Sequence, residues 1–242
     1  MAQSRIRVFF LHLKNLTMKT TLLFLSVFLS VNLFAQDSTF IDKRDGRIYK
    51  TVKIGEQEWM AENLAFVPDS GVFYYIDTNS FRYRDTTNLT KYGLMYDWET
   101  SKEVCPTGWH LPSNGEWSRL TKFLGGKEVA GLKMKSTYGW VDLGNGNGNG
   151  SNLSGFNALP GGRYHEGQHL DVGYYGRWWS RSKDGTRHTV PARDGKKRYY
   201  LYLYASSYIL YCCDFNNKPT SSEFVRVRTY KRAGLFVRCI KD

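Results

Sequence analysis

The 242-residue sequence lacks long hydrophobic segments and has only four cysteines and 22 acidic residues. Its mean hydropathy is −0.48 and 23% of its residues are charged, which excludes a polytopic membrane protein. Tyr, Trp and Phe nevertheless make up 16% of the chain, which excludes a disordered polymer. The length fits one sizeable domain, or at most two small ones, with its own buried core.

Several catalytic patterns are also missing from the sequence. It contains no Gly-x-Ser-x-Gly elbow, and its carboxylates offer no pair that can be assigned to acid–base work. The Gly-Asn tract at 144–152 lacks the Asp-rich spacing of a calcium loop and is expected to be flexible or tightly turned. These absences predict a protein that is not an enzyme and that holds no cofactor.

The N-terminal segment has the pattern of an export signal. Met18-Lys19 begins a stretch with one charge, an apolar run over 22–31 and then the small residue Ala35. The run is too short to span a bilayer, and no cysteine follows it, which argues against a lipoprotein anchor. We therefore expect residues 1–35 to be a signal peptide, in which residues 1–17 reflect either a misassigned start codon before Met18 or a longer basic n-region. The mature protein is expected to be secreted, periplasmic or at the cell surface, without a transmembrane segment.

The positive charge is concentrated in the last third of the chain. The leader holds four basic residues and no acidic one, so its removal lowers the net charge from +12 to +8. Residues 36–160 carry 14 Lys and Arg against 15 Asp and Glu, whereas residues 161–242 carry 16 against 7. Export and the lack of a nucleic-acid-binding motif argue against nucleic acid as the partner. An anionic glycan or cell-wall polymer suits the charge better.

Export also makes disulfides expected, and four cysteines allow three complete pairings. Cys212 and Cys213 are neighbours, so in a strand their side chains point to opposite faces and are poorly placed to bond to each other. This favours a bridge between Cys105 and Cys239.

The rest of the chain predicts an α+β domain, because a hairpin, then helices, then a series of antiparallel strands follow one another without strand–helix–strand alternation. Ser113 and Glu116 form a capping box before a helix over 114–124, and a second helical turn is expected over 127–135. We expect a linker at 36–44, a hairpin within 47–60, a short helix within 96–104, a surface insertion at 68–90, and strands at 197–205, 207–213, 223–230 and 234–240.

The sharpest catalytic match is the stretch His165-Glu166-Gly167-Gln168-His169. On a helix this spacing places two imidazoles on one face for Zn²⁺, with Glu166 as general base. Gly167 is costly inside a helix, and no third ligand follows at the spacing that such enzymes use. A hairpin tip flanked by polar side chains is therefore preferred, and an exported metal-dependent hydrolase remains the alternative.

Trp178 and Trp179 are the most informative aromatic residues. In a strand they face opposite sides, so we expect one to be buried and the other exposed. Arg181 lies beside them, and an aromatic face next to guanidinium groups suits stacking on sugar rings. A buried core with a solvated polar rim explains the same residues equally well.

Five segments carry a resemblance to a known family: residues 45–64, 92–120 with the CPTGWHLPS block, 153–164, 178–182 and the terminal LFVRCIKD. They resemble the Fibrobacter succinogenes major paralogous domain, found in secreted proteins of Bacteroidetes-type bacteria, over about residues 45–242. Cys212-Cys213, the 68–90 insertion and the long Gly-Asn tract depart from the family pattern.

The resemblance implies a fold similar to C-type-lectin-like domains and to formylglycine-generating enzymes. That fold has paired N- and C-terminal strands, two short helices and long loops. The resemblance also implies a Cys105–Cys239 bridge and a hairpin at 165–169. The lectin calcium motifs Glu-Pro-Asn and Trp-Asn-Asp are absent, and no pair of active cysteines can be placed.

The sequence therefore predicts a secreted or surface-displayed, non-catalytic binding or adhesion module for glycan or another extracellular polymer. It predicts no metal site. The ligand-binding residues that we expect are Tyr164, His165, Trp178, Trp179 and Arg181.

Overall fold

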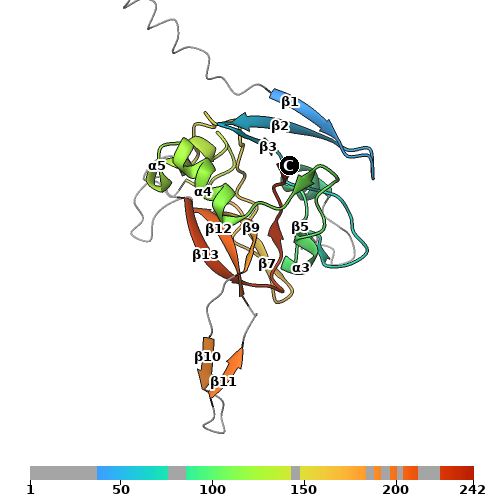
Figure 1. Ribbon diagram of the computed structural model, residues 1–242, viewed down its shortest axis with the longest axis vertical. Coiled ribbons are helices and arrows are strands. Elements are labelled where there is room, and N and C mark those ends of the chain that lie inside the picture. The colour runs from blue at the N-terminus through green and yellow to red at the C-terminus, as the bar shows by residue number, and fades with distance from the viewer. Residues whose placement is uncertain are drawn as a thin grey trace, which may run out of the picture. The chain divides into compact units, whose positions relative to one another are not determined.

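The computed structural model describes residues 37–75, 86–142, 148–183, 188–191, 197–200, 204–211 and 224–242. In these residues short, mostly antiparallel strands combine with a few short helices (Figure 1). The predicted α+β class is confirmed. The predicted signal peptide, residues 1–35, lies outside the described residues, as do Cys212 and Cys213.

The first sheet joins the early strands of the domain to the end of the chain. Its strand order is β1-β2-β3-β15-β6, and neighbouring strands are antiparallel. The bounds are β1 Asp37–Ile41, β2 Ile48–Ile54, β3 Gln57–Met60, β6 Trp109–His110 and β15 Ile240–Lys241. The predicted hairpin is confirmed, since β2 and β3 pair across Gly55, which has the positive φ of 62° that favours glycine. Ile240 lies opposite Trp59, so an early and a late strand pair as expected.

The linker predicted at 36–44 is wrong for residues 37–41, which form β1 and pair along β2. The segment is polar, but Phe40 packs on Trp109 with ring centroids 5.1 Å apart. This contact joins residues far apart in the sequence, so no local pattern predicts it.

The second sheet has the order β13-β12-β9-β14-β5-β4. Its neighbours are antiparallel except β14 and β9, which are parallel. The bounds are β4 Val72–Phe73, β5 Met95–Tyr96, β9 Tyr175–Lys183, β12 Tyr204–Tyr211, β13 Phe224–Tyr230 and β14 Leu235–Phe236. The surface insertion predicted at 68–90 is wrong in part, because β4 belongs to this sheet and Tyr75 is buried. The strand predicted at 234–240 is divided between β14 and β15, which lie in different sheets.

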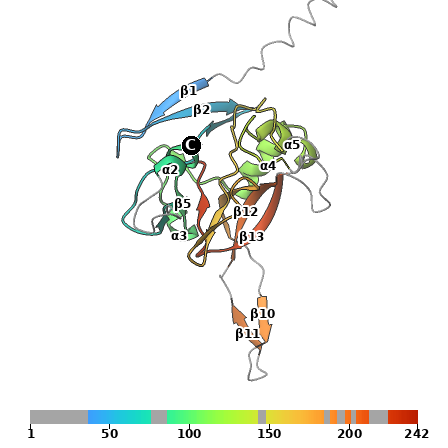
Figure 2. The same cartoon turned by 180° about the vertical axis from the view of Figure 1, so that it is seen from behind.

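The helices lie at the two ends of the second sheet. Figures 1 and 2 show α4 and α5 at the β13 end, and Figure 2 shows α2 and α3 near β5. Their bounds are α2 Thr86–Tyr92, α3 Trp98–Ser101, α4 Asn114–Phe123 and α5 Lys127–Met134. The predicted helices at 114–124 and 127–135 are confirmed, and both hydrogen bonds of the Ser113–Glu116 capping box are present. Among the described residues, no helix has the length and apolar composition to cross a bilayer.

Two further hairpins complete the described strands. β7 Arg163–His165 pairs with β8 Gln168–Leu170, and β10 His188–Pro191 pairs with β11 Lys197–Tyr200. β7 is held to the second sheet by reciprocal backbone hydrogen bonds between Tyr164 and Gly234.

A disulfide joins Cys105, just before β6, to Cys239, just before β15. This is the predicted bridge. It fastens the end of the chain to the middle of the sequence, next to the hydrophobic core that contains Tyr96, Trp98 and Trp179.

Candidate functional site

The HEGQH stretch forms a tight hairpin and not a helix. Glu166 and Gly167 connect β7 to β8 with positive φ of 48° and 85°, as in a type I′ turn. Because Tyr164 lies directly opposite His169, His165 and His169 are on opposite faces of the hairpin. The two imidazoles therefore lack the shared face that the zinc motif requires. Nowhere in the described part of the chain do three potential metal ligands gather.

Each histidine of this hairpin instead has a packing role. The His169 ring stacks on Tyr75 with centroids 4.5 Å apart, and its Nε2 lies 2.8 Å from the Tyr74 carbonyl oxygen. The His165 ring stacks on Tyr230, with centroids 5.8 Å apart and planes 18° from parallel.

The expectation that one of Trp178 and Trp179 is exposed is wrong, because both side chains are 0% exposed. They face opposite sides of β9, but β9 is an inner strand of the sheet and both its faces are covered. The Trp178 Nε1–H donates to Asn63 Oδ1 at 2.8 Å, and the Trp179 Nε1–H donates to the Tyr96 carbonyl at 2.7 Å. Neither indole is accessible to a ligand.

The other two predicted ligand-binding residues do not join them in one site. Tyr164 is half-buried and stacks on Phe73, with ring centroids 4.4 Å apart. Arg181 is exposed near the end of β9, and its backbone N–H donates to Pro112 O. Of the five residues, Arg181 is exposed, Tyr164 and His165 are half-buried, and the two tryptophans are fully buried.

A groove lined by cations lies where α4, α5 and β13 meet. We call it the basic groove; its volume is about 650 Å³, and it is lined by Ser118, Thr121, Lys122, Gly125, Gly126, Lys127, Phe224 and Arg226. The lining holds three cations and no carboxylate. Phe224 is 2% exposed and packs against Trp117, with ring centroids 5.3 Å apart, so its ring is not open to a ligand. The groove can therefore bind an anion.

The backbone adds positive potential to the same groove. The N-cap residue of α5 is Gly126. Glycine has no side chain, so no cap side chain accepts a hydrogen bond from the backbone N–H groups in the first turn of this helix. The N-terminus of this eight-residue helix lies at the groove, where the helix dipole favours negative charge.

The exposed face of β13 continues the groove as a basic and aromatic stripe. Arg226, Arg228 and Tyr230 alternate with the half-buried Val225 and Val227, so the three exposed side chains share one face. The stripe ends at the stacked pair of Tyr230 and His165. Two features of the sequence point to this surface: the alternating pattern of β13 and the basic excess after residue 161. Neither feature indicates that α4 and α5 contribute residues to it.

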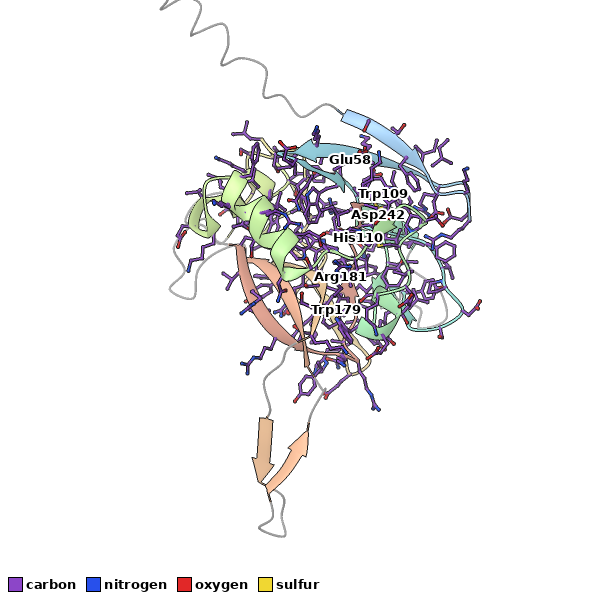
Figure 3. The ribbon with its side chains drawn as sticks, viewed as in Figure 1. Glu58, Trp109, His110, Trp179, Arg181 and Asp242 are labelled. Carbon is purple, nitrogen blue, oxygen red and sulfur yellow. A yellow bond between two sulfur atoms is a disulfide. The ribbon has the colours of Figure 1, made fainter. Side chains whose placement is uncertain are left out.

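A second polar cluster surrounds His110 (Figure 3). Its Nδ1 lies 2.5 Å from Asp242 Oδ1, and its Nε2 lies 2.9 Å from Glu116 Oε1. The Ser113 hydroxyl donates to Glu116 Oε2 at 2.8 Å and not to the imidazole. The cluster therefore does not form a serine nucleophile with its base; it fastens the start of α4 to the last residues of the sheet.

Glu116 makes this cluster sensitive to acid. Burial acts to raise the pKa of Glu116, but hydrogen bonds from the Ser113 N–H, from His110 and from the Ser113 hydroxyl outweigh it, so the net pKa is lowered. A carboxyl group whose pKa is lower in the folded state stabilises the fold above its unfolded pKa of about 4.3. That contribution is lost as the pH falls through the lower, folded pKa.

We expect Glu116→Gln to reduce the free energy of unfolding near pH 6 and to make little difference well below pH 4. Glutamine can keep the capping box, so the substitution isolates the charge. The test is urea denaturation at several pH values, with Glu128→Gln in the first turn of α5 as the matched control. A difference between wild type and Glu116→Gln that does not change with pH would contradict this account.

The fold and these surfaces define the protein as a small, disulfide-bonded α+β domain with a basic groove on its surface. A family model described as the Fibrobacter succinogenes major domain matches residues 52–241, and the chain belongs to this family. The resemblance found in the sequence is thereby confirmed. No match was found among curated proteins or among solved structures.

Proposed function

We propose that this protein is an exported, non-catalytic binding module with a C-type-lectin-like fold, whose ligand is an anionic extracellular polymer, in the first place an acidic glycan. The basic groove is the observation that carries the proposal, because Lys122, Lys127 and Arg226 meet beside Phe224 without a carboxylate in the lining. Guanidinium and ammonium groups bind carboxylate and sulfate, and the exposed ring of Tyr230 on the same face of β13 suits the apolar face of a sugar ring.

The length of the surface favours a polymer over a single small molecule. Arg226 and Tyr230 are four residues apart on one strand, which corresponds to about 13 Å. Charged and aromatic groups thus recur beyond the groove, at a spacing that successive sugar units of a chain can reach. Lys127 is the weakest part of this surface, since it lies 3.5 Å from the exposed carboxylate of Glu128.

The disulfide supports the proposed export of the protein, and the strand pairing supports the proposed C-type-lectin-like fold. A Cys105–Cys239 bridge is favoured in an exported protein, because cytoplasmic thiols are kept reduced. The pairing of β15 with β3 brings the end of the chain beside the early strands, which is the arrangement that a C-type-lectin-like fold requires.

The test is the binding of polygalacturonate and of heparin, with uncharged dextran as the neutral polymer, by isothermal titration calorimetry. We expect both acidic polymers to bind, dextran not to bind, and EDTA to have no effect. In the double variant Lys122→Gln/Arg226→Gln, the affinity should fall about tenfold or more, because each charge-assisted contact contributes about 1.5–3 kcal/mol.

The matched control is Lys50→Gln/Lys53→Gln, which removes the same charge from exposed positions on β2. If both double variants lose affinity equally, the binding is non-specific attraction and the groove is not the site. Equal binding of dextran and polygalacturonate would contradict the proposed role of charge.

A further inference from the structure

A separate cavity of about 340 Å³ lies between β2, the segment after β3, and α2. None of its lining residues lines the basic groove. Its lining includes two almost fully buried polar side chains, Arg238 and Tyr49, which are 1% and 2% exposed. The hydrogen bonds of these two side chains indicate what the cavity can hold.

Arg238 is a buried cation that forms no ion pair with any carboxylate in the part of the chain that the structure describes. Its Nε–H and one Nη2–H donate to Asn63 Oδ1 at 3.1 and 2.8 Å, and Nη1 donates to the carbonyl oxygens of Met60 and Phe156. A guanidinium has five N–H groups, so one Nη2–H has no acceptor among the described residues. Burial lowers the pKa of Arg238 to about 9, opposed by the charge of Glu62, and the group remains protonated at neutral pH.

Tyr49 supplies a second unused donor. Its hydroxyl oxygen accepts a hydrogen bond from the Ala65 N–H at 3.0 Å, and no acceptor for its own O–H is found among the described residues. Burial raises the pKa of Tyr49 to about 12, so the hydroxyl keeps its proton at neutral pH. A buried donor without an acceptor destabilises the fold, and this cavity has two such donors in its lining.

The remaining charges of the lining favour the same kind of ligand. Arg47 and Lys91 add two cations to Arg238, and Glu62 is the one carboxylate among the lining residues. Tyr138 is 52% exposed, so an aromatic ring lies at the border between the cavity and solvent. Two donors, an excess of positive charge and an aromatic ring match an anion attached to a ring-sized body.

We propose that this cavity is a binding site for a small organic carboxylate, whose oxygens accept the free hydrogens of Arg238 and Tyr49. The carboxylate supplies the counter-charge that Arg238 lacks, and Lys91 strengthens the attraction. The cavity is large enough for one six-membered ring, and the site is independent of the polymer-binding groove.

The test uses two pairs of compounds that differ only in charge: glucuronate with glucuronamide, and benzoate with benzamide. Binding is followed through the Nε–H resonance of Arg238 in the full mature protein. We expect at least one acid to shift this resonance saturably, and the amide of that acid to bind about tenfold more weakly, because it loses a charge-assisted hydrogen bond.

Two variants test whether the acid binds in this cavity. Tyr49→Phe removes the free hydroxyl, and Lys91→Gln removes a charge from the last turn of α2 without disturbing the buried network. Each should weaken the acid about tenfold. The control is Lys122→Gln, the corresponding lysine in the last turn of α4, which should affect only the polymer.

Equal affinities for acid and amide, or no shift of the Arg238 resonance by either acid up to its solubility limit, would overturn the proposal. Unchanged acid binding in both Tyr49→Phe and Lys91→Gln would do the same. Because these outcomes do not involve the basic groove, they leave the proposed binding of polymers untouched.

Discussion

Replacing Asn63 with alanine will lower the free energy of unfolding by about 3–5 kcal/mol, the cost of leaving a buried charge without its partner. Asn63 Oδ1 accepts hydrogen bonds from Arg238 and from Trp178, and its Nδ2–H donates to the Tyr92 carbonyl at 2.8 Å. The substitution breaks all of these at once beside a guanidinium group that is only 1% exposed. Equilibrium denaturation with urea, followed by tryptophan fluorescence, measures the loss.

Asn63→Asp is the informative companion to this variant. It keeps the oxygen that Arg238 and Trp178 use and adds a negative charge beside the guanidinium, while it loses the donor to Tyr92. We expect a smaller loss than in Asn63→Ala. If both variants are equally destabilised, or if Asn63→Ala costs under 1 kcal/mol, Asn63 does not compensate the buried charge.

Removing the disulfide is the second substitution with a large expected effect. Cys105 and Cys239 are 134 residues apart in sequence, so the bridge restricts the unfolded chain over most of the domain. We expect Cys105→Ser/Cys239→Ser to lower the free energy of unfolding by about 2–5 kcal/mol. The comparison is made in a Cys212→Ser/Cys213→Ser background, so that no other thiol can exchange with the bridge.

In that background, adding dithiothreitol to the bridged protein should reproduce the loss seen in the Cys105→Ser/Cys239→Ser variant. The reductant should have no effect on the variant itself. A bridged protein that is no less stable after complete reduction would show that the disulfide has no stabilising role.

The elements that the sequence predicts correctly are those with local signals. The helix α4 follows from the capping box of Ser113 and Glu116 and from the spacing of Trp117 and Leu120, all within eight residues of one another. The hairpin of β2 and β3 follows from alternation and a glycine turn in the same way.

The burial of Trp178 and Trp179 could not be predicted by the same means. Strand periodicity places the two indoles on opposite faces, but it does not tell whether the second face of the sheet is covered. That depends on where a strand lies in the sheet. β9 lies between β12 and β14, and Trp178 contacts Asn63 from a distant part of the chain.

The sequence predicts the positive charge of the candidate site but not which elements form it. The basic excess after residue 161 indicates a positively charged surface on the C-terminal strands, and Arg226 belongs to it. The lysines of the groove come from α4 and α5, where the net charge of the segment is close to zero. The cavity depends on contacts between Asn63 and Arg238, which are 175 residues apart.

The most direct test of the account is to map a galacturonate oligomer on the ¹⁵N-labelled protein by chemical-shift perturbation. If the basic groove binds the polymer, the backbone amides of Gly125, Gly126, Phe224 and Arg226 will shift together and saturably, and a neutral oligomer of the same length will leave them unchanged. Shifts confined to residues outside the basic groove, or equal shifts with the neutral oligomer, would contradict it.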